Sequence, residues 1–315
     1  MRCYRLHLQQ TSGATTPWHS DTLWGQLCWI FRDWYGEQQL TQLLEEAKEG
    51  NIPFVVSDGF PKDFLPMPVN AMSLFPYPAA RNKAEGIRQI ETAKAFKKLK
   101  YLHKDFFEQA IKGKDLPSQE IICSSPPPKN HNTMQTRNAI NRETNTVQDE
   151  HLYQTPWLMT GDGNLDLYVL VQENFENIFW TCFDALEKQG FGGDLSIGMG
   201  AFKRIETEAL TLPKAQEPNC FITLSHCTPS PDMPVNGQYN LRVKYGKLGH
   251  ERSRQGSPFK KPVIQCKPGA VFWGVPAKEY CGCLVDNVAF DSEYGGTVQC
   301  GLSIIVPALM PEGGI

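Results

Sequence analysis

A glycine-rich stretch between a helix and a strand leaves the backbone few conformations at that point of the chain. Residues 190–200 read Gly-Phe-Gly-Gly-Asp-Leu-Ser-Ile-Gly-Met-Gly, so five of these eleven positions are glycine. Apolar residues at helical spacing over 175–189 precede the stretch, and a strand is expected over 201–207. Because glycine reaches positive φ and has no Cβ to keep a ligand away, we expect a tight connection with exposed N–H groups. Such groups can hold phosphate oxygens.

The neighbouring residues decide between a phosphate site and a plain turn. The stretch is not a P-loop or a dinucleotide fingerprint, because no Gly-Lys-Ser/Thr closes it and it follows a helix. Aromatic and basic residues come directly afterwards and favour a phosphate site. A flexible turn without a ligand is the alternative. The candidate residues are Gly192, Gly193, Ser196, Gly198, Gly200, Phe202, Lys203 and Arg204.

The order of predicted elements indicates an α+β fold. We expect a strand over 2–9, a helix over 21–35, strands over 52–57 and 165–172, the 175–189 helix and the 201–207 strand. This order fits a ferredoxin-like βαββαβ unit. Further strands are predicted over 221–226, 239–245, 263–266, 271–275 and 298–306. At about 150 residues per domain, we expect a domain over 1–210, with an insertion at about 80–153, and a β-rich domain over 211–315.

The insertion changes character along its length. Residues 81–114 hold ten basic and four acidic residues in a helical pattern. Residues 123–150 are polar and interrupted by prolines, which indicates a functional or mobile segment. The part from Arg137 to Tyr153 is predicted to form an extended hairpin. Its polar residues Arg137, Asn138, Arg142 and Thr144 can clamp a nucleic-acid backbone, with Met134 or Ile140 against a base, although an ordinary polar loop is the better explanation of these residues taken alone.

A second basic stretch covers residues 242–267. It holds eight basic residues and one acidic residue, with aromatic residues between them. Cations interleaved with aromatics suit a path for single-stranded nucleic acid, whereas a solvated face is the usual meaning of a run of charge. Its glycines and prolines predict a long basic loop, with Arg252, Arg254, Lys260 and Lys261 as candidate phosphate contacts. The sequence leaves open whether this stretch contacts RNA or protein.

His19, Ser20 and Asp21 stand where the first helix begins. Ser20 is predicted to be its N-cap, and Asp21 suits the first turn. Adjacent residues cannot form a Ser-His-Asp triad, whose side chains come from separate segments. His19 and Ser20 at a helix N-terminus suit contact with a phosphate. His19 as a general base for RNA cleavage is the alternative.

Composition excludes several other classes of protein. The net charge is −3, which excludes binding of nucleic acid by bulk charge. No apolar run reaches the length of about 18 residues that a membrane helix needs. The ten cysteines contain no Cys-x-x-Cys pair and predict reduced thiols in a cytoplasmic protein. Cys220, His226 and Cys227 are better explained as core residues than as metal ligands, and we expect no cofactor.

Five blocks, in order, resemble the RAMP proteins. His19–Gly25 (HSDTLWG) is similar to their HSDTLFG opening, and the SDGFP and LPMP sequences that follow Val56 resemble their next block. RNAINRET from Arg137, followed by Leu152-Tyr153, is similar to RNxIDRxT…LY, and residues 192–202 resemble the glycine-rich loop. SPFKKPV from Ser257 completes the set. This order resembles the Csm-type subunit of type III-A CRISPR effector complexes that holds the crRNA 5′ tag.

The resemblance implies two ferredoxin-like units, a β-hairpin thumb and no catalysis. It implies that the glycine loop and His19 meet the crRNA 5′ tag, and that the Arg137–Thr144 hairpin inserts between bases where tag and guide meet. It also implies partners: a large polymerase-like subunit and an adjacent backbone RAMP subunit, with target RNA met only indirectly. Trp24 and Asn141 depart from the family pattern, and Asn141 removes a carboxylate that metal-assisted cleavage needs.

Two enzymatic hypotheses stay open at this point. The chain can be a crRNA-processing endoribonuclease of the same superfamily, with His19 as its base. It can also be a backbone RAMP subunit that cuts target RNA with Asp21. Loss of cleavage in His19→Ala or Asp21→Ala, respectively, distinguishes these hypotheses from a binding subunit.

Overall fold

The computed structural model describes residues 1–75, 80–114, 116–249, 257–275, 277–290 and 296–311. Its first sheet confirms the predicted ferredoxin-like unit. β1 (Arg2–Gln10), β2 (Phe54–Val56), β8 (Asn164–Val171) and β9 (Phe202–Leu210) lie in the antiparallel order β2-β8-β1-β9, and β3 (Phe60–Pro61) also pairs with β8. Connected through α1 (Ser20–Tyr35) and α6 (Glu176–Gln189), these strands have the βαββαβ order.

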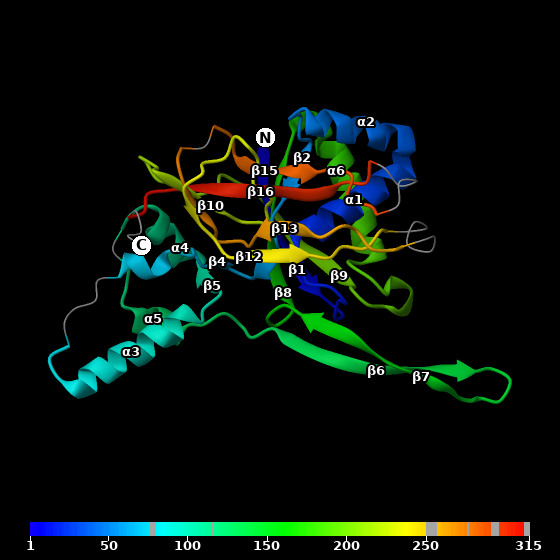
Figure 1. The fold of residues 1–315 in the computed structure, drawn as a ribbon, viewed down its shortest axis with the longest axis horizontal. Helices are drawn as coiled ribbons and strands as arrows, with labels where there is room; N and C mark the ends of the chain where they lie inside the picture. Colours follow the sequence, from blue (N-terminus) through cyan, green and yellow to red (C-terminus); the bar gives the residue numbers. More distant parts are fainter. Residues whose placement is uncertain (76–79, 115, 250–256, 276, 291–295, 312–315) are drawn as a thin grey trace.

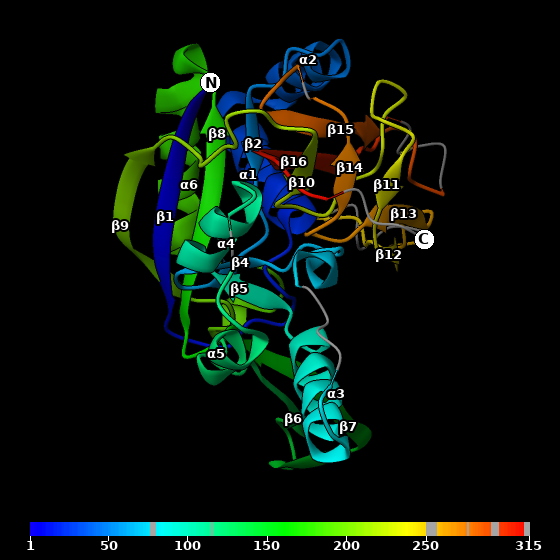
Figure 2. The same ribbon diagram turned by 90° about the vertical axis from the view of Figure 1, so that its left-hand side faces the viewer.

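The two helices cover one face of this sheet (Figure 2). Leu6 and Leu8 of β1, Leu27 of α1 and Phe183 of α6 are all buried in one hydrophobic core. Apolar residues that recur at helical spacing along both helices account for this packing. The short 3₁₀ turn over Glu173–Phe175 leads into α6.

The second five-stranded sheet shares this core. Its strands lie in the order β11-β14-β10-β16-β15, with bounds β10 (Cys220–Thr223), β11 (Gly237–Gln238), β14 (Val271–Trp273), β15 (Tyr280–Val285) and β16 (Gln299–Ala308). Among the described residues, no α-helix follows α6. Helix α1 contacts β16 as well as α6, so one helix of the first unit also covers the second sheet.

Part of the insertion projects from the body of the molecule (Figure 1), whereas its helix over Lys104–Ile111 packs against β16 in the core. The insertion contains a 3₁₀ turn (Ala71–Leu74), α3 (Lys83–Lys97), α4 (Lys104–Ile111) and α5 (Gln119–Ser124), and β4 (Phe64–Pro66) pairs with β5 (Tyr101–His103). The predicted hairpin is confirmed and is longer than expected, with β6 (His131–Asn141) paired to β7 (Thr146–Met159). Figure 1 shows this thumb extending far beyond both sheets.

The basic stretch contains a smaller two-stranded sheet of β12 (Leu241–Lys244) and β13 (Val263–Cys266), close to the predicted strands. Elements that were not predicted include α2 (Glu37–Lys48), β15 and the short strands β5 and β11. Helix α2 has an apolar stripe at helical spacing that packs against the core and consists of Leu40, Leu43, Leu44 and Ala47. A signal for this helix was therefore present in the sequence and was missed. All ten cysteines are free thiols, as predicted. Within the described residues, no helix has the length and apolar character to span a membrane.

Candidate functional site

A buried carboxylate lies where the two sheets and the start of α1 meet. Oδ1 of Asp58 accepts hydrogen bonds from the backbone N–H groups of Ser20 at 3.0 Å and His226 at 3.2 Å. Oδ2 lies 2.6 Å from Nδ1 of His226. Burial raises the pKa of Asp58, but His226, His19 and the Ser20 N–H outweigh it, so the pKa lies below its ordinary value. Asp58 is therefore ionised, and it joins its own segment to the start of α1 and to the residues that follow β10.

This bridge corrects the predicted capping of α1. The N-cap residue is His19, whose backbone is extended, and not Ser20. The free N–H at the start of the helix is satisfied by Asp58 from a distant segment. The Ser20 hydroxyl is buried without a hydrogen-bond partner, so Ser20 has no surface through which to contact a phosphate.

His19 is held by an arginine of the basic stretch. Its Nδ1 lies 2.7 Å from Nη1 of Arg242. Because a guanidinium can only donate, Nδ1 is the acceptor, and the proton of the neutral ring is on Nε2. Burial lowers the pKa of His19 to about 4, so the ring is neutral near pH 7. This tautomer offers a donor to a phosphate and no free lone pair on Nε2 for a general base.

Asp21 is enclosed by the same stretch. Its side chain is fully buried and forms ion pairs with Arg242 at 3.2 Å and Lys244 at 3.1 Å. Gln299 donates a further hydrogen bond of 2.9 Å to Asp21. Burial raises the pKa of Asp21, but Lys244 and Arg242 outweigh it and hold the pKa below its ordinary value. The arrangement gives Asp21 a structural role and leaves its carboxylate no access to a substrate.

His19, Asp58 and His226 also form the one group among the described residues that can converge on a metal ion. Their ligand atoms lie within 4.8 Å of one another. However, Asp58 already accepts three hydrogen bonds, and Nδ1 of His19 accepts from a cationic side chain. The guanidinium of Arg242 therefore already supplies positive charge beside His19, where a metal ion would otherwise supply it. Cys227 is buried, and its backbone forms an isolated β-bridge with that of Cys266, in agreement with its interpretation as a core residue.

The glycine loop uses its N–H groups inside the protein. Gly192 donates to Gln26 at 3.0 Å, Gly193 to Thr15 at 3.1 Å and Gly200 to the Gly13 carbonyl at 2.8 Å. Gly198 donates to the carbonyl of Leu195 across the 3₁₀ turn Leu195–Ile197. These four N–H groups therefore already have acceptors within the protein, although Gly193 and Gly198 themselves are exposed. The loop holds the 11–16 segment in place, and its exposed part lies within residues 193–198.

The residues after the loop divide between core and surface. Phe202 is 3% exposed and packs against Trp18, so it is a core residue and not a stacking platform for a base. Arg204 forms an ion pair with Asp184 at 2.6 Å and lies over Trp180. Lys203 is exposed. Of the three residues predicted to add stacking and charge, only Lys203 is placed for an external phosphate.

The candidates in the basic stretch are likewise separated. Nζ of Lys260 lies 3.1 Å from Oε1 of Gln299, and burial lowers the pKa of Lys260 to about 8. Lys260 is therefore half-buried, with its ammonium group bound within the protein, contrary to the predicted contact with a phosphate. Lys261 is exposed and donates to the carbonyl of Asn287. Arg252 and Arg254 lie outside the described residues.

The thumb presents its candidates to solvent. Asn138, Arg142 and Thr144 are exposed, and Arg137 is half-buried beside Gln135. Five large apolar side chains of the thumb are exposed, namely Met134, Ile140, Val147, Leu152 and Tyr153. Near the tip, Ile140 lies opposite Val147, and these two side chains are 61% and 48% exposed.

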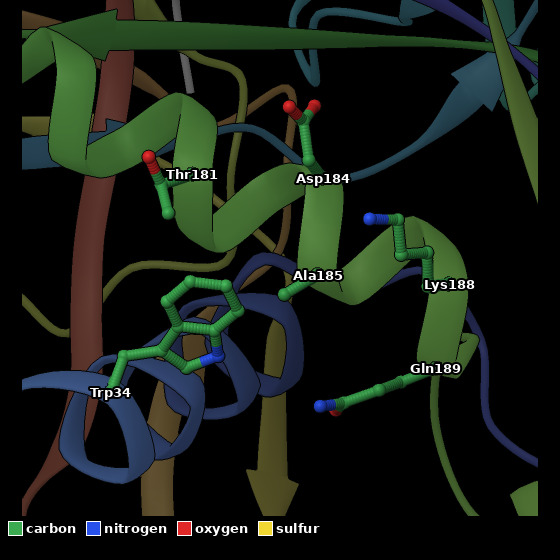
Figure 3. A pocket seen from close by; sticks show the side chains of 6 residues that line it. All are labelled: Trp34, Thr181, Asp184, Ala185, Lys188 and Gln189. Carbon is green, nitrogen blue, oxygen red and sulfur yellow. The ribbon is translucent and has the colours of Figure 1, made fainter.

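A shallow cavity of about 320 Å³ lies between α1 and α6 (Figure 3). Trp34, which is 61% exposed, projects from α1 toward Ala185 and Gln189 of α6. Of the seven tryptophans, all within the described residues, only Trp34 is exposed. Because tryptophan is enriched at protein interfaces, Trp34 is a candidate contact for a protein partner on this face.

Comparisons with known proteins identify the fold. No protein-family model matches the chain, and no curated protein matches its sequence. A chain in the crystal structure of the Csm1-Csm4 cassette in complex with pppApA matches with a TM-score of 0.62 and 18% identity, over 99% of this chain and 100% of that one. A chain in the Csm3-Csm4 subcomplex of the type III-A CRISPR-Cas interference complex matches with a TM-score of 0.60 and 14% identity, over 98% and 99%. The chain therefore has the α+β RAMP fold of these structures, as the resemblance implied.

Several residues of the site had no signal in the sequence. Asp58 belongs to the SDGFP block, but nothing there shows that its carboxylate holds Ser20 and His226. Arg242 is one of eight basic residues in its stretch, and only the fold selects it for His19.

The glycine loop allows a matched test of backbone geometry. A Cβ on Gly200 lies 1.9 Å from the carbonyl oxygen of Phe191, whereas a Cβ on Gly198 meets nothing within 4 Å. Both glycines have positive φ. We expect Gly198→Ala to cost about 1 kcal/mol of unfolding free energy from left-handed backbone strain, and Gly200→Ala to cost more than about 3 kcal/mol. Urea unfolding measures both, and equal losses contradict the proposed close approach.

The neutral state of His19 predicts a pH dependence of stability. The unfolded chain takes up a proton on His19 near pH 6.5, whereas the folded chain does so only near pH 4. Stability from the neutral ring is therefore complete above pH 6.5 and is lost as the pH falls toward 4. The free energy of unfolding is measured with urea between pH 7 and 4. We expect it to change less steeply with pH in His19→Gln than in the unsubstituted chain, by up to the equivalent of one proton. Parallel profiles contradict this assignment.

Proposed function

We propose that this chain is a non-catalytic RNA-binding subunit of a type III-A CRISPR interference complex. In this role it holds the 5′ tag of the crRNA and joins the large polymerase-like subunit to the adjacent backbone RAMP subunit in antiviral defence. The observation that carries the proposal is the projecting thumb on a RAMP fold that matches the Csm4-containing structures along the whole chain.

The thumb suits a wedge between bases. Ile140 is near the tip, exposed and beside Arg142, which is also exposed. An apolar side chain can fill the gap between two unstacked bases, while a cation next to it meets the adjacent phosphate. Ile140 and Arg142 therefore provide the two contacts that separation of the tag from the guide requires.

The body of the chain supplies a smaller set of RNA contacts than the sequence indicated. Nε2 of His19, the turn at Ser196, Lys203 and Lys261 are the body candidates that keep exposed or partly exposed polar groups. The remaining candidates that the structure describes there have partners inside the protein. RNA contact is therefore concentrated in the thumb and a few body positions.

The lack of catalysis is also part of this proposal. His19 donates from Nε2 and has a pKa well below the neutral value that suits a general base. Asp21 is enclosed by Arg242 and Lys244. Both enzymatic hypotheses require one of these side chains to reach RNA with a free lone pair. Metal-independent cleavage that disappears in His19→Ala is the result that favours the endoribonuclease instead.

The assemblies in which the matched structures were solved support the two proposed protein partners. One is a Csm1-Csm4 cassette and another a Csm3-Csm4 subcomplex. Those assemblies place Csm4 with two different proteins, which supports a bridging role for a chain of the same fold. Trp34 is one candidate contact for such a partner.

The thumb can be tested with a fluorescent base. A synthetic RNA with the repeat-derived 5′ end of the host array carries 2-aminopurine where tag and guide meet. We expect the purified chain to raise its fluorescence by unstacking it, and Ile140→Ser to reduce this rise and weaken binding about tenfold, given a stacking contribution of about 1–3 kcal/mol per base. Ile205→Ser is the matched control, because Ile205 is 54% exposed and belongs to β9 of the first sheet and not to the thumb.

Two results contradict the proposed wedge. One is an unchanged fluorescence in Ile140→Ser, and the other is an equal loss in Ile205→Ser. Equal binding to an RNA with a scrambled 5′ end contradicts recognition of the tag.

A further inference from the structure

The hairpin of β12 and β13 has its polar and apolar faces reversed. Arg242 and Lys244 point inward to Asp21, with side chains only 15% and 21% exposed. Leu241, Val243 and Ile264 point outward and are 53%, 48% and 59% exposed. Alternate residues of a strand lie on opposite faces, and a sheet that faces water usually has its polar side outward.

The outward side chains form one continuous surface. Val243 and Ile264 are directly opposite each other across the two strands. Leu241 and Tyr245 lie two residues to either side of Val243 and are also exposed. A single exposed apolar residue needs no explanation, but a contiguous group marks an interaction site. We call Leu241, Val243, Tyr245 and Ile264 the hairpin face.

The contacts of Arg242 and Lys244 fix which face of the hairpin points to solvent. Arg242 is bound to Asp21, His19 and Gln265, and Lys244 to Asp21 and Thr22. A register shift of one residue exchanges the two faces and leaves the buried Asp21 carboxylate without its cations. The ion pairs inside therefore fix the apolar side chains outside.

Lysines surround the hairpin face. Lys247, Lys261 and Lys267 are exposed, and the described residues of 237–249 and 257–269 contain no aspartate or glutamate. Figure 2 shows β12 and β13 at the side of the molecule opposite to β9. Charge complementarity thus selects an acidic surround on whatever covers this face.

We propose that the hairpin face is a docking surface for a protein partner with an apolar centre and an acidic rim. Tyr245 at one end is the one aromatic residue of the hairpin face, whereas Leu241, Val243 and Ile264 have no π face on which a base can stack, so the face as a whole favours a protein over RNA. The apolar centre with a charged rim is the usual arrangement of protein interfaces. This inference does not depend on RNA binding by the thumb.

The test is site-specific photocrosslinking in the native host. Full-length chain with p-benzoylphenylalanine in place of Val243 is irradiated, and the crosslinked species is identified by mass spectrometry. We expect one polypeptide, joined at a segment with apolar residues flanked by aspartate or glutamate. The same probe in place of Ile205 is the control and is expected to miss this polypeptide.

The affinity of that polypeptide is then measured with purified variants. We expect Leu241→Ser with Ile264→Ser to weaken binding at least about tenfold, in line with interface hot spots. Ile87→Ser with Ile90→Ser on α3 is the control, because both residues are similarly exposed. Lys247→Glu with Lys267→Glu is expected to weaken binding and reduce its salt dependence without touching the apolar centre.

Four results overturn the proposal. They are a crosslink to RNA, a crosslink to a second copy of this chain, no crosslink at position 243, and serine variants that bind as tightly as the control. If the serine variants fail to fold, as circular dichroism reports, the glutamate variants decide, and unchanged affinity in them overturns the acidic rim.

Discussion

The carboxylate of Asp58 is the interaction on which the arrangement of this molecule depends. It is buried and ionised, and it accepts from the first amide of α1 and from both the backbone and the ring of His226. Removing one partner of a buried charge costs about 3–5 kcal/mol, because the other is left uncompensated. The start of α1 and the end of β10 are therefore held together, and with them the two sheets.

The positions of the other charged residues follow from this junction. Once α1 begins beside β10, His19 and Asp21 face the strand that carries Arg242 and Lys244. Those two cations form ion pairs with Asp21 on the inner face of the hairpin. Because alternate residues of a strand lie on opposite faces, the apolar residues between them point outward. A stretch that is strongly basic in sequence thus presents an apolar surface with lysines at its edge. The free thumb, far from this junction, keeps its side chains available to a ligand.

The sequence predicted the ferredoxin-like unit well, because alternation and helical spacing report which face of each element is buried. It also predicted the thumb, which the structure extends to residues 131–159. It failed where a partner comes from a distant segment. Ser20 has the chemistry of an N-cap, but Asp58 supplies the acceptor. The glycine N–H groups could bind a phosphate in principle, but they donate hydrogen bonds to Gln26, Thr15 and Gly13 instead.

Similar reasons separate Lys260 from Lys261. Both are adjacent lysines in a basic stretch, and alternation alone places one inside and one outside. Only the tertiary contact with Gln299 shows that Lys260 is the one that points toward the protein, where it is half-buried. Charge counted along a sequence therefore identifies a basic segment but not the face that meets a polyanion.

The RNA that accompanies this chain decides whether it holds the 5′ end of crRNA. The tagged chain is purified gently from its native host, and the bound RNA is sequenced. We expect short RNAs that share one repeat-derived 5′ end and differ beyond it. An absence of RNA, or a random mixture of cellular RNAs, contradicts this function.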